Sequence, residues 1–321
     1  MKLEIPGNAV DPLGEALHFL RMSGTFYARS ELSAPWGIEL PPFAGSLMFH
    51  VLTAGRCWLE TARGESRFLQ TGDLALVPHG EGHRLLSERG LATARLFDLP
   101  REQVSERYEV MWHGGGGERT SLVCGVVRFD HPAAQHLVKL LPGIIAVEAS
   151  RSDQEWVQAT IRFMASEARA LRPGGETVIT RLADILVIQA IRSWIEQDPA
   201  AQTGWLGALQ DRQIGRAIAR IHREPERPWT VAALAAEAAM SRSAFAARFT
   251  ERVGEPAMHY VARWRMHVAS SWLRDDAAPL ADVASRLGYQ SEAAFSRAFK
   301  RFVGVPPGAV RRGTAAPLPP A

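Results

Sequence analysis

Hydrophobic residues recur in short segments along the first part of the chain, where Gly, Pro or charged residues separate them at intervals of about ten. These segments predict β-strands at Ser46–Leu52, Cys57–Thr61, Leu74–Val77, Leu91–Leu96 and Ser121–Phe129. The Gly-rich stretch His113–Gly117 predicts a flexible loop rather than a phosphate cradle, because no Lys-Ser/Thr pair follows it. Such a rhythm is typical of a β-sandwich or a small barrel, which we place at about residues 1–130.

After about residue 132 the hydrophobic period becomes that of helices. Leu137–Ile145 predicts a short helix or a turn-rich connection. A longer helix is predicted by the spacing of Trp156, Ile161, Met164 and Ala168. Arg172–Gly175 ends it, and Val178–Ile195 predicts a second helix, so that a helical hairpin occupies about 132–196. The second helix is apolar on more than one side, and its extra face packs either on the barrel or on a second copy of the chain.

The remainder of the chain is predicted to form a separate helical domain. Residues 1–196 form the first domain, and a polar, Pro-containing segment predicts a linker at 197–206. Helical patterns then run through 207–312, and the Pro-rich tail at 313–321 is predicted to be disordered. The fold class is therefore α+β, with a β-rich domain that carries a helical hairpin and an all-α domain after it.

Composition describes a soluble globular protein. The chain has 321 residues, of which 46% are hydrophobic and 22% charged, enough for about two domains with cores of their own. Its apolar runs are shorter than the ~18 residues of a membrane span, and its start lacks the apolar stretch of a signal peptide. Two cysteines cannot form a disulfide framework, which fits a reducing cytoplasm. We therefore expect a cytoplasmic protein without a membrane partner.

The charge is distributed unevenly between the two domains. Residues 1–206 contain 20 Lys+Arg and 24 Asp+Glu, whereas residues 207–321 contain 17 and 10, so the net charges are −4 and +7. A basic domain beside an acidic one indicates a polyanionic partner such as nucleic acid. Charge alone does not decide this, because many basic surfaces are merely solvated.

An internal repeat lies within the basic domain. Its motif of Ser, two Phe, Gly and Pro occurs twice with an offset of 50 residues, as Ser241, Phe245, Phe249, Gly254 and Pro256 and again as Ser291, Phe295, Phe299, Gly304 and Pro306. Each copy follows a short apolar helix and predicts a helix-turn-helix. The serine caps the second helix, the Phe pair anchors it, and the glycine ends it. Pro256–Leu273 predicts one helix of about 27 Å between the copies.

The second helix of each copy presents polar and basic residues suited to a DNA major groove. We predict DNA contacts from Arg242, Ser243, Arg248, Arg252, Ser291, Glu292, Arg297, Lys300 and Arg301. Lys300 is predicted to contact phosphate, and Arg242 or Glu292 a base edge. The alternative is an ordinary helical bundle, which the duplication of caps, Phe pairs and basic faces makes much less favourable.

These residues give the sequence a resemblance to the AraC/XylS family of bacterial transcription regulators. The resemblance covers about Trp205–Arg312 and rests on Leu234-Ala235, Met240–Phe245, Phe249, Gly254–Pro256, Tyr260, Arg263–Met266, Val283-Ala284, Gly288-Tyr289, Ser291, Phe295–Arg301 and Gly304–Pro306. Two departures are Ala239, where the family usually has Gly, and Ala247, where it usually has Arg, so Arg248 need not inherit that role. The resemblance implies a non-enzymatic transcription regulator that binds double-stranded DNA and an effector, forms a homodimer and works with RNA polymerase. It is expected to be an activator, although the sequence itself leaves activation and repression open.

A second resemblance concerns the β-rich domain. Gly72-Asp73 followed by Val77–His83 resembles the second cupin motif, and Phe49–Gly55 resembles the strand and turn before it. With Ala28–Gly37 and Cys124-Gly125, these segments resemble the cupin sensor domain of one AraC-type subfamily. A full first cupin motif is absent from the sequence, which argues against metal-dependent oxygenase chemistry.

Two kinds of site are candidates inside this domain. His50, His83 and Cys124, with His79 as a further donor, suit a Zn²⁺ ion, although they could equally be interior residues with ordinary partners. A small-molecule effector pocket is predicted to be lined by Trp36, Phe43, Met48, His50, Trp58 and His83, whose aromatic members could instead be plain core.

The sequence therefore predicts a sequence-specific DNA-binding transcription regulator that a small-molecule effector controls. One alternative is a metal-dependent cupin enzyme with an accessory helical domain. Another is a DNA-binding scaffold whose barrel only dimerises.

Overall fold

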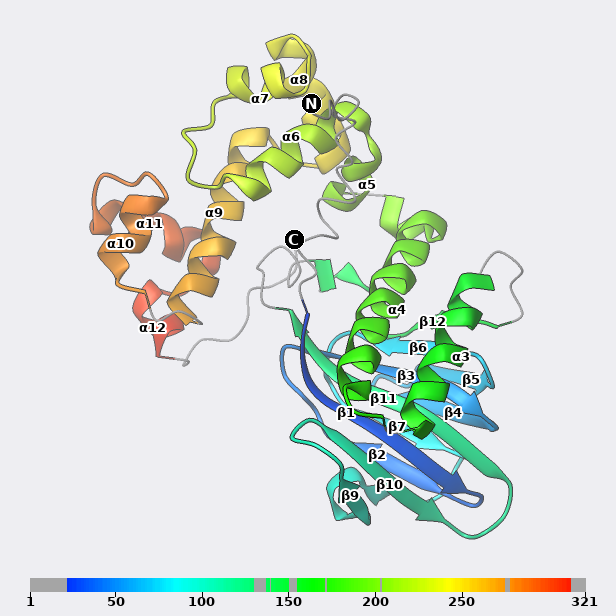
Figure 1. Cartoon of the computed structure of the whole chain (residues 1–321). Coiled ribbons are helices and arrows are strands. Elements are labelled where there is room, and N and C mark those ends of the chain that lie inside the picture. The colour runs from blue at the N-terminus through cyan, green and yellow to red at the C-terminus, as the bar shows by residue number, and fades with distance from the viewer. Residues whose placement is uncertain are drawn as a thin grey trace, which may run out of the picture. The chain divides into compact units, whose positions relative to one another are not determined.

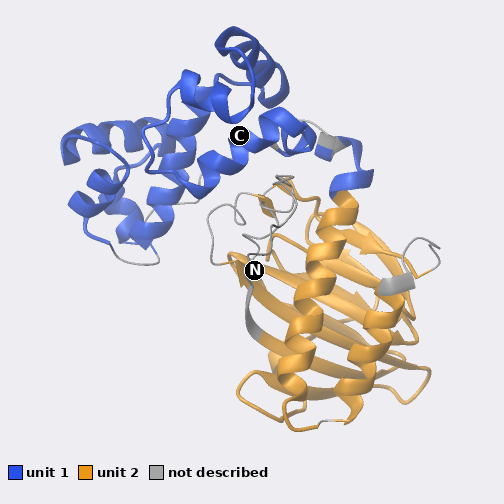
Figure 2. Cartoon of the chain, turned by 45° about the horizontal axis from the view of Figure 1, so that its top comes forward, with its two compact units in different colours: residues 1–19, 131–134, 195–321 blue, residues 20–130, 135–194 orange. Residues whose placement is uncertain are grey.

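The strands of the N-terminal part form two sheets. In this computed structural model the described residues are 22–129, 137–138, 140–149, 155–170, 172–202, 204–274 and 278–312. Within these ranges the chain divides into two compact units, whose boundary lies between Trp194 and Ile195 (Figures 1 and 2). We describe each unit by itself.

The larger sheet of the N-terminal unit has seven strands. In spatial order they are β12 (Ile145–Val147), β6 (Leu74–Val77), β3 (Ser46–Ala54), β11 (Arg119–Phe129), β1 (Met22–Ser33), β10 (Tyr108–Gly114) and β9 (Arg101–Gln103). The smaller sheet has five, which are β5 (Ser66–Gln70), β4 (Arg56–Thr61), β7 (His83–Leu86), β2 (Gly37–Leu40) and β8 (Ala94–Arg95). A 3₁₀ helix, η1 (Leu96–Asp98), follows β8, so the strand predicted at Leu91–Leu96 is only two residues long.

The predicted β-rich, cupin-type domain is confirmed, but the two sheets do not close into a single barrel within the described residues. The successive strands β3 and β4 are not paired, because β3 bonds to β6 and β11 while β4 bonds to β5 and β7. Gly55 makes the turn between them at φ 78°. A Cβ there would lie 2.3 Å from the Arg119 carbonyl, so only glycine fits this change of sheet.

The core of the unit fills the space between the sheets. Side chains from both sheets form one buried apolar cluster that includes Leu40, Leu59 and Leu85 from the smaller sheet and Met48, Leu52 and Leu122 from the larger. Strand β3 is buried along its first seven residues, because the smaller sheet covers one of its faces and the rest of the unit the other. The interior between the sheets is therefore where a buried site can form.

Two helices lie side by side across one face of the larger sheet (Figure 1). They are α3 (Glu155–Ala170) and α4 (Gly175–Gln197), which confirms the predicted helical hairpin. Arg29 of β1 donates to the Ala168 carbonyl at 2.9 Å and ties α3 to the sheet. The short helix or turn-rich connection predicted over Leu137–Ile145 ends in a strand that was not predicted, since Ile145–Val147 forms the edge strand β12 and pairs with β6.

The C-terminal unit is helical throughout its described residues. Its elements are η3 (Pro199–Gln202), α5 (Gly204–Gln210), α6 (Arg212–Arg223), α7 (Val231–Glu237), α8 (Arg242–Val253), α9 (Ala257–Arg274), α10 (Leu280–Arg286), α11 (Glu292–Val303) and α12 (Pro307–Arg311). The linker predicted at 197–206 thus contains η3 and the start of α5. The tail at 313–321 lies outside the described residues.

The two helix-turn-helix motifs are α7–α8 and α10–α11, and the long helix α9 joins them (Figure 1). Phe245 and Phe249 are fully buried and pack on each other, and Phe249 packs on Tyr260 of α9. Phe295 and Phe299 are fully buried in a cluster with Met266 and Leu273 of α9 and with α10. Each motif is therefore fixed to α9 by its own Phe pair, as the repeat predicts. Among the described helices none is long and apolar enough to cross a membrane.

Candidate functional site

The exposed helices α8 and α11 are held at both ends by the residues that the repeat predicts. Ser241 accepts a hydrogen bond from the Ala244 N–H at 3.3 Å, and Ser291 accepts one from the Ala294 N–H at 3.2 Å. Gly254 and Gly304 end the helices in the left-handed conformation at φ 86° and 83°. Ala239 occupies the turn of the first motif at φ 53°, where the second motif has Gly288 at φ 78°.

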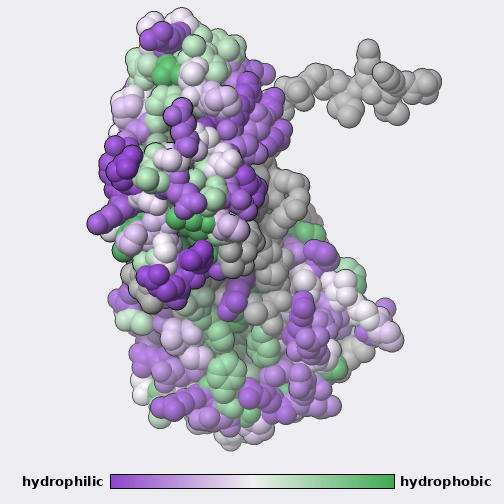
Figure 3. Space-filling model, turned by 90° about the vertical axis from the view of Figure 1, so that its left-hand side faces the viewer, coloured by the Kyte–Doolittle hydropathy of each residue, from purple (hydrophilic) through white to green (hydrophobic). Residues whose placement is uncertain are grey.

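The residues predicted to contact DNA are mostly exposed on these helices. They are Arg242, Ser243 and Arg252 on α8, Ser291 at the N-cap of α11, and Glu292, Arg297, Lys300 and Arg301 on α11. Within the described part of the chain, no acidic side chain pairs with Arg242, Arg297 or Lys300. In the face shown by Figure 3, hydrophilic side chains project over this unit with small hydrophobic areas between them. These cations are thus free to meet a phosphate backbone.

Arg248 differs from this expectation, because its guanidinium is held inside the unit. Its Nε donates to Oδ2 of Asp211 at 2.9 Å, and its Nη1 donates to Oε1 of Gln213 at 3.0 Å. Oδ1 of Asp211 meanwhile caps α6 by accepting the N–H groups of Gln213 and Ile214. Arg252 lies 3.7 Å from the same carboxylate and remains mostly exposed. The Asp211 clamp, formed by Asp211 and Gln213, therefore takes one cation out of the basic face of α8.

Sequence reasoning missed the Asp211 clamp. The pattern at Asp211 signals a helix N-cap but nothing about a partner 37 residues away. Burial alone would raise the pKa of the Asp211 carboxyl, but the N–H groups of Ile214 and Gln213 and the Arg248 guanidinium outweigh it and lower the pKa. The ionised carboxylate is therefore the form that the fold stabilises.

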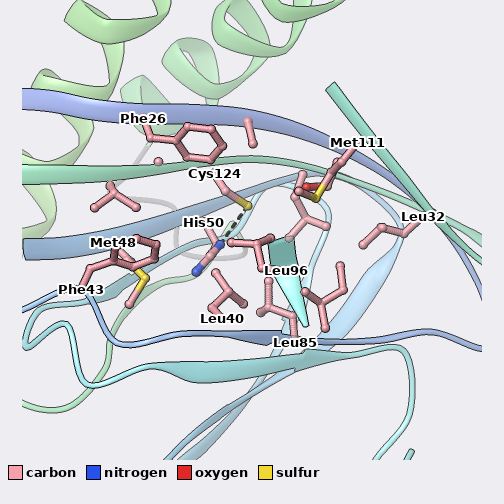
Figure 4. Close-up of a pocket in the computed structure, with 16 residues that line it drawn as sticks. Phe26, Leu32, Leu40, Phe43, Met48, His50, Leu85, Leu96, Met111 and Cys124 are labelled. Atoms are coloured by element: carbon pink, nitrogen blue, oxygen red, sulfur yellow. Dashed lines mark hydrogen bonds between the residues drawn. The ribbon is translucent and has the colours of Figure 1, made fainter. Parts of the chain in front are cut away.

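An interior cavity lies between the two sheets of the N-terminal unit (Figure 4). Three of the predicted effector residues, Phe43, Met48 and His50, line it. His83 does not line it but contacts His50, and Trp36 is buried in the core without reaching the cavity.

Trp58, which was predicted for the effector pocket, lies outside this cavity. It lies beside Phe68 with ring centroids 5.1 Å apart, and the Arg89 guanidinium stacks on its ring at 3.7 Å. Phe68 is 46% exposed, so this aromatic pair faces away from the core. The alternation of side chains along β4 explains this position, because Cys57 and Leu59 take the two inward positions on either side of Trp58.

The predicted metal ligands meet, but not around one point. His50 directs Nδ1 to Sγ of Cys124 at 2.9 Å and Nε2 to Nε2 of His83 at 2.6 Å. A Zn²⁺ ion needs its donors within about 2.0–2.3 Å of one centre, whereas the two nitrogens of one imidazole diverge. His79 is held elsewhere, since its Nε2 donates to the Leu141 carbonyl at 2.9 Å. Among the described residues, no group of three or more His, Cys, Asp or Glu side chains could hold a metal, so the donors do not fit the ion.

Burial keeps these groups neutral. Burial, with a smaller effect of His83, lowers the pKa of His50 well below its usual value, and burial lowers that of His83 to about 3. Burial likewise raises the pKa of the Cys124 thiol. The cluster of His50, His83 and Cys124 thus offers neutral hydrogen-bonding groups at neutral pH and no charge.

Each of the two units matches a known domain family. A cupin family model matches residues 11–196, and a helix-turn-helix domain model matches residues 234–313. A protein of Streptomyces lividans described as an AraC-like transcription regulator is 33% identical over 94% of this chain and 98% of its own length. The RCS-specific HTH-type transcriptional activator RclR of Escherichia coli is 28% identical over 94% of this chain and 97% of its own.

Among solved structures, the DNA-binding domain of AdpA in complex with a target DNA is similar. It is 30% identical to this chain, covers 30% of it and 87% of the AdpA domain, and has a TM-score of 0.28. The domain matches and the full-length relative agree with the capped, basic helix pair of the C-terminal unit. The chain therefore belongs to the AraC family of DNA-binding transcription regulators, with an N-terminal cupin domain.

Proposed function

We propose that α8 and α11 enter the major groove of the target DNA and that a small molecule between the two sheets of the N-terminal unit controls this binding. The observation that carries the first part is the unpaired state of Arg242, Arg297 and Lys300, seen within the described residues, on helices fixed by caps at both ends. Rigid helices with free cations match the groove without reorganisation.

Arg242 lies in the first turn of α8, where a recognition helix meets base edges, and Arg297 lies in the second turn of α11. Lys300, nearer the end of α11, suits a phosphate contact. Both contacts raise affinity, but only a base contact depends on sequence. Substitution of Lys300 is therefore expected to weaken binding to all DNA about equally.

The test is the salt dependence of DNA affinity, measured by fluorescence anisotropy on a fragment of the regulated promoter and on a scrambled duplex of equal length. For Lys300→Ala, the slope of log K against log salt is expected to fall by about 0.9, the value for one phosphate. For Arg242→Ala, the preference for promoter over scrambled DNA is expected to fall by roughly 1–3 kcal/mol. Arg67→Ala, on the exposed strand β5, is the control. Unchanged slopes and preferences in both α8 and α11 variants would refute the assignment.

Self-association is part of the proposal. Phe163 of α3 is 53% exposed and Ile185 of α4 is 46% exposed, so the helical hairpin presents apolar side chains that a second copy could cover. A double substitution of Phe163 and Ile185 to Glu should shift the mass measured by light scattering from dimer to monomer. Phe68→Glu alters an equally exposed apolar residue on β5 and is expected to leave the dimer intact.

The relative RclR is by name a transcriptional activator, which supports an activating role for this chain. RNA polymerase is the further partner that such a role requires. A regulator of chromosomal DNA acts where that DNA lies, which supports a cytoplasmic location. The rival cupin enzyme gains no support from the donor geometry of the described residues. Elemental analysis for Zn, Fe and Mn on the purified chain checks that point.

A further inference from the structure

The cavity between the sheets has an almost entirely apolar lining. Of the 16 residues that line it, Ser30, His50 and Cys124 are the ones with a polar side-chain atom, and no Lys, Arg, Asp or Glu is among them. The remainder are apolar residues, among them Phe43, Met48 and Met111. Figure 4 shows His50 and Cys124 together at one place on the wall, surrounded by apolar side chains.

From this lining we infer that the cavity takes an electrically neutral, mainly hydrocarbon molecule that presents one hydrogen-bonding group to His50 and Cys124. The inference rests on the proposed effector control and specifies the chemical class of the effector.

A charged ligand does not fit because nothing in the wall could pair with it. A buried ion without a partner costs several kcal/mol or more. The imidazoles cannot supply the charge, since burial lowers the pKa of both His50 and His83. A carboxylate, a phosphate or an ammonium group in the interior would therefore have no oppositely charged side chain in the wall to pair with.

A polyol does not fit for a related reason. Each hydroxyl buried without a hydrogen-bond partner costs about 1–3 kcal/mol, and polar side chains lie at one place on the wall. A ligand with one polar group can satisfy it there. Sugars and nucleosides, with polar groups on every side, would leave most of theirs unpaired.

The polar place on the wall can exchange its internal contact for a ligand. Nδ1 of His50 contacts Sγ of Cys124 at 2.9 Å, and sulfur is a weak hydrogen-bond partner that an oxygen can replace at a gain. On the other side of His50, Nε2 contacts His83, whose own Nδ1 is buried without a partner among the described residues. The imidazole pair can thus adopt either proton arrangement, so a ligand carbonyl or hydroxyl can be accommodated.

Entry of a ligand requires side chains to move. The cavity has a volume of only about 30 Å³, which is room for about one water molecule, so a larger ligand fits only after side chains have moved. Met48 and Met111, which are unbranched and adapt readily, line the cavity. Phe43, which lines the cavity, lies edge-on to Phe97, which is 50% exposed, so few side chains separate this part of the cavity from solvent.

The test uses four probes of graded chemistry with the full-length protein and isothermal titration calorimetry. The probes are 2-nonanone, nonane, nonanoate and glucose at pH 7.5. We expect 2-nonanone to bind best, nonane to bind about 5–10-fold more weakly, and nonanoate to bind at least 100-fold more weakly. Glucose is expected to give no binding. Tighter binding of nonanoate or glucose than of 2-nonanone, or no binding of any probe, overturns the inference.

Variants locate the site. His50→Phe keeps a ring of similar size and should abolish the preference for 2-nonanone over nonane while leaving nonane binding within about threefold. Met111→Trp should fill the cavity and weaken both probes at least tenfold, with circular dichroism as the check of folding. Trp58→Phe, outside the cavity, should change neither. Equal effects of Met111→Trp and Trp58→Phe would show that the probes bind elsewhere and would overturn the inference.

Failure of the proposed function is a separate outcome. If 2-nonanone binds with the expected selectivity but leaves the affinity for promoter DNA unchanged, the ligand class stands and effector control is refuted. If a charged or polyhydroxylated molecule binds in the cavity and does change DNA affinity, effector control stands and the ligand class is refuted.

Discussion

Asp211→Asn is the substitution that isolates the Asp211 clamp, because the two carboxylate oxygens have separate tasks. Oδ1 caps α6 and Oδ2 receives Arg248. Asparagine keeps the capping oxygen and replaces the other by an amide that cannot pair with a guanidinium. The side chain of Asp211 is 5% exposed and that of Arg248 is 41% exposed, so the pair is neither fully buried nor fully at the surface. We therefore expect its loss to lower the free energy of unfolding by about 1 kcal/mol. Asp211→Ala also removes the cap, for a total of about 2 kcal/mol.

Amide hydrogen exchange of the free protein, followed by mass spectrometry of peptides from α6 and α8, measures these losses locally. Taken over α6 and α8 together, the loss of protection is expected to be about 5-fold for Asp211→Asn, which affects α8, and about 30-fold for Asp211→Ala, which also removes the cap of α6. Glu251→Gln changes an exposed acid on α8 and is the control. Equal losses for the two Asp211 variants, or no loss for either, would refute the division of labour between the oxygens.

The same clamp predicts a pH dependence with a definite sign. The folded-state pKa of Asp211 is lowered, mainly because backbone N–H groups and Arg248 outweigh burial. Its stabilisation is therefore fully present above the unfolded pKa of about 4 and is lost as pH falls through the lower folded value. In urea unfolding of the whole chain, the gap between wild type and Asp211→Asn should stay constant from about pH 8 to 5 and close below about pH 4. A gap that widens below pH 4 would contradict the assigned pKa direction.

Three further outcomes follow from local features. Ala239→Gly should stabilise the first motif by about 0.5 kcal/mol in thermal unfolding, because relief of the strain at φ 53° exceeds the added chain entropy, whereas a loss of stability would refute strain at that turn. Phe299→Ala should destabilise the second motif by about 3–5 kcal/mol, since the side chain is fully buried, and a loss below 1 kcal/mol would refute its role as an anchor. Burial raises the pKa of the Cys57 thiol to about 12, so iodoacetamide at pH 8 should label it only after unfolding, as judged by mass spectrometry; labelling of the native protein would contradict the burial.

The helix-turn-helix repeat was predictable because its determinants are local. A cap acts over three residues, a Phe pair over four, and a C-terminal glycine at one position, so each leaves a signature in a short window of sequence. Because the motif occurs twice at a fixed offset of 50 residues, a chance match to a helix-turn-helix was much less favourable than a true one. At Ala239 the sequence shows only a departure from the family pattern, and the structure adds that this residue adopts a positive φ of 53°.

The arrangement of the strands was predictable only in part, because pairing depends on partners far apart in the chain. The β-rich character and most strand positions followed from alternation, but nothing local shows that β3 pairs with β11 while β4 joins the other sheet. The same limit explains Trp58, because a residue at the middle of a short strand can face either way. Phe43, Met48 and His50 reached the cavity because the strand and loop that carry them face its interior.

The clearest long-range effect is the asymmetry that the structure adds to a symmetrical repeat. The sequence gives both recognition helices three basic residues, Arg242, Arg248 and Arg252 on α8 and Arg297, Lys300 and Arg301 on α11. Asp211 neutralises the middle member of the first set from outside the repeat, and no described acid does the same to Arg297 or Lys300. We therefore expect phosphate neutralisation to fall mainly on α11, while α8 keeps Arg242 in its first turn and Arg252, which is mostly exposed and lies 3.7 Å from Asp211. Such a division suits a first motif that reads sequence and a second that supplies affinity.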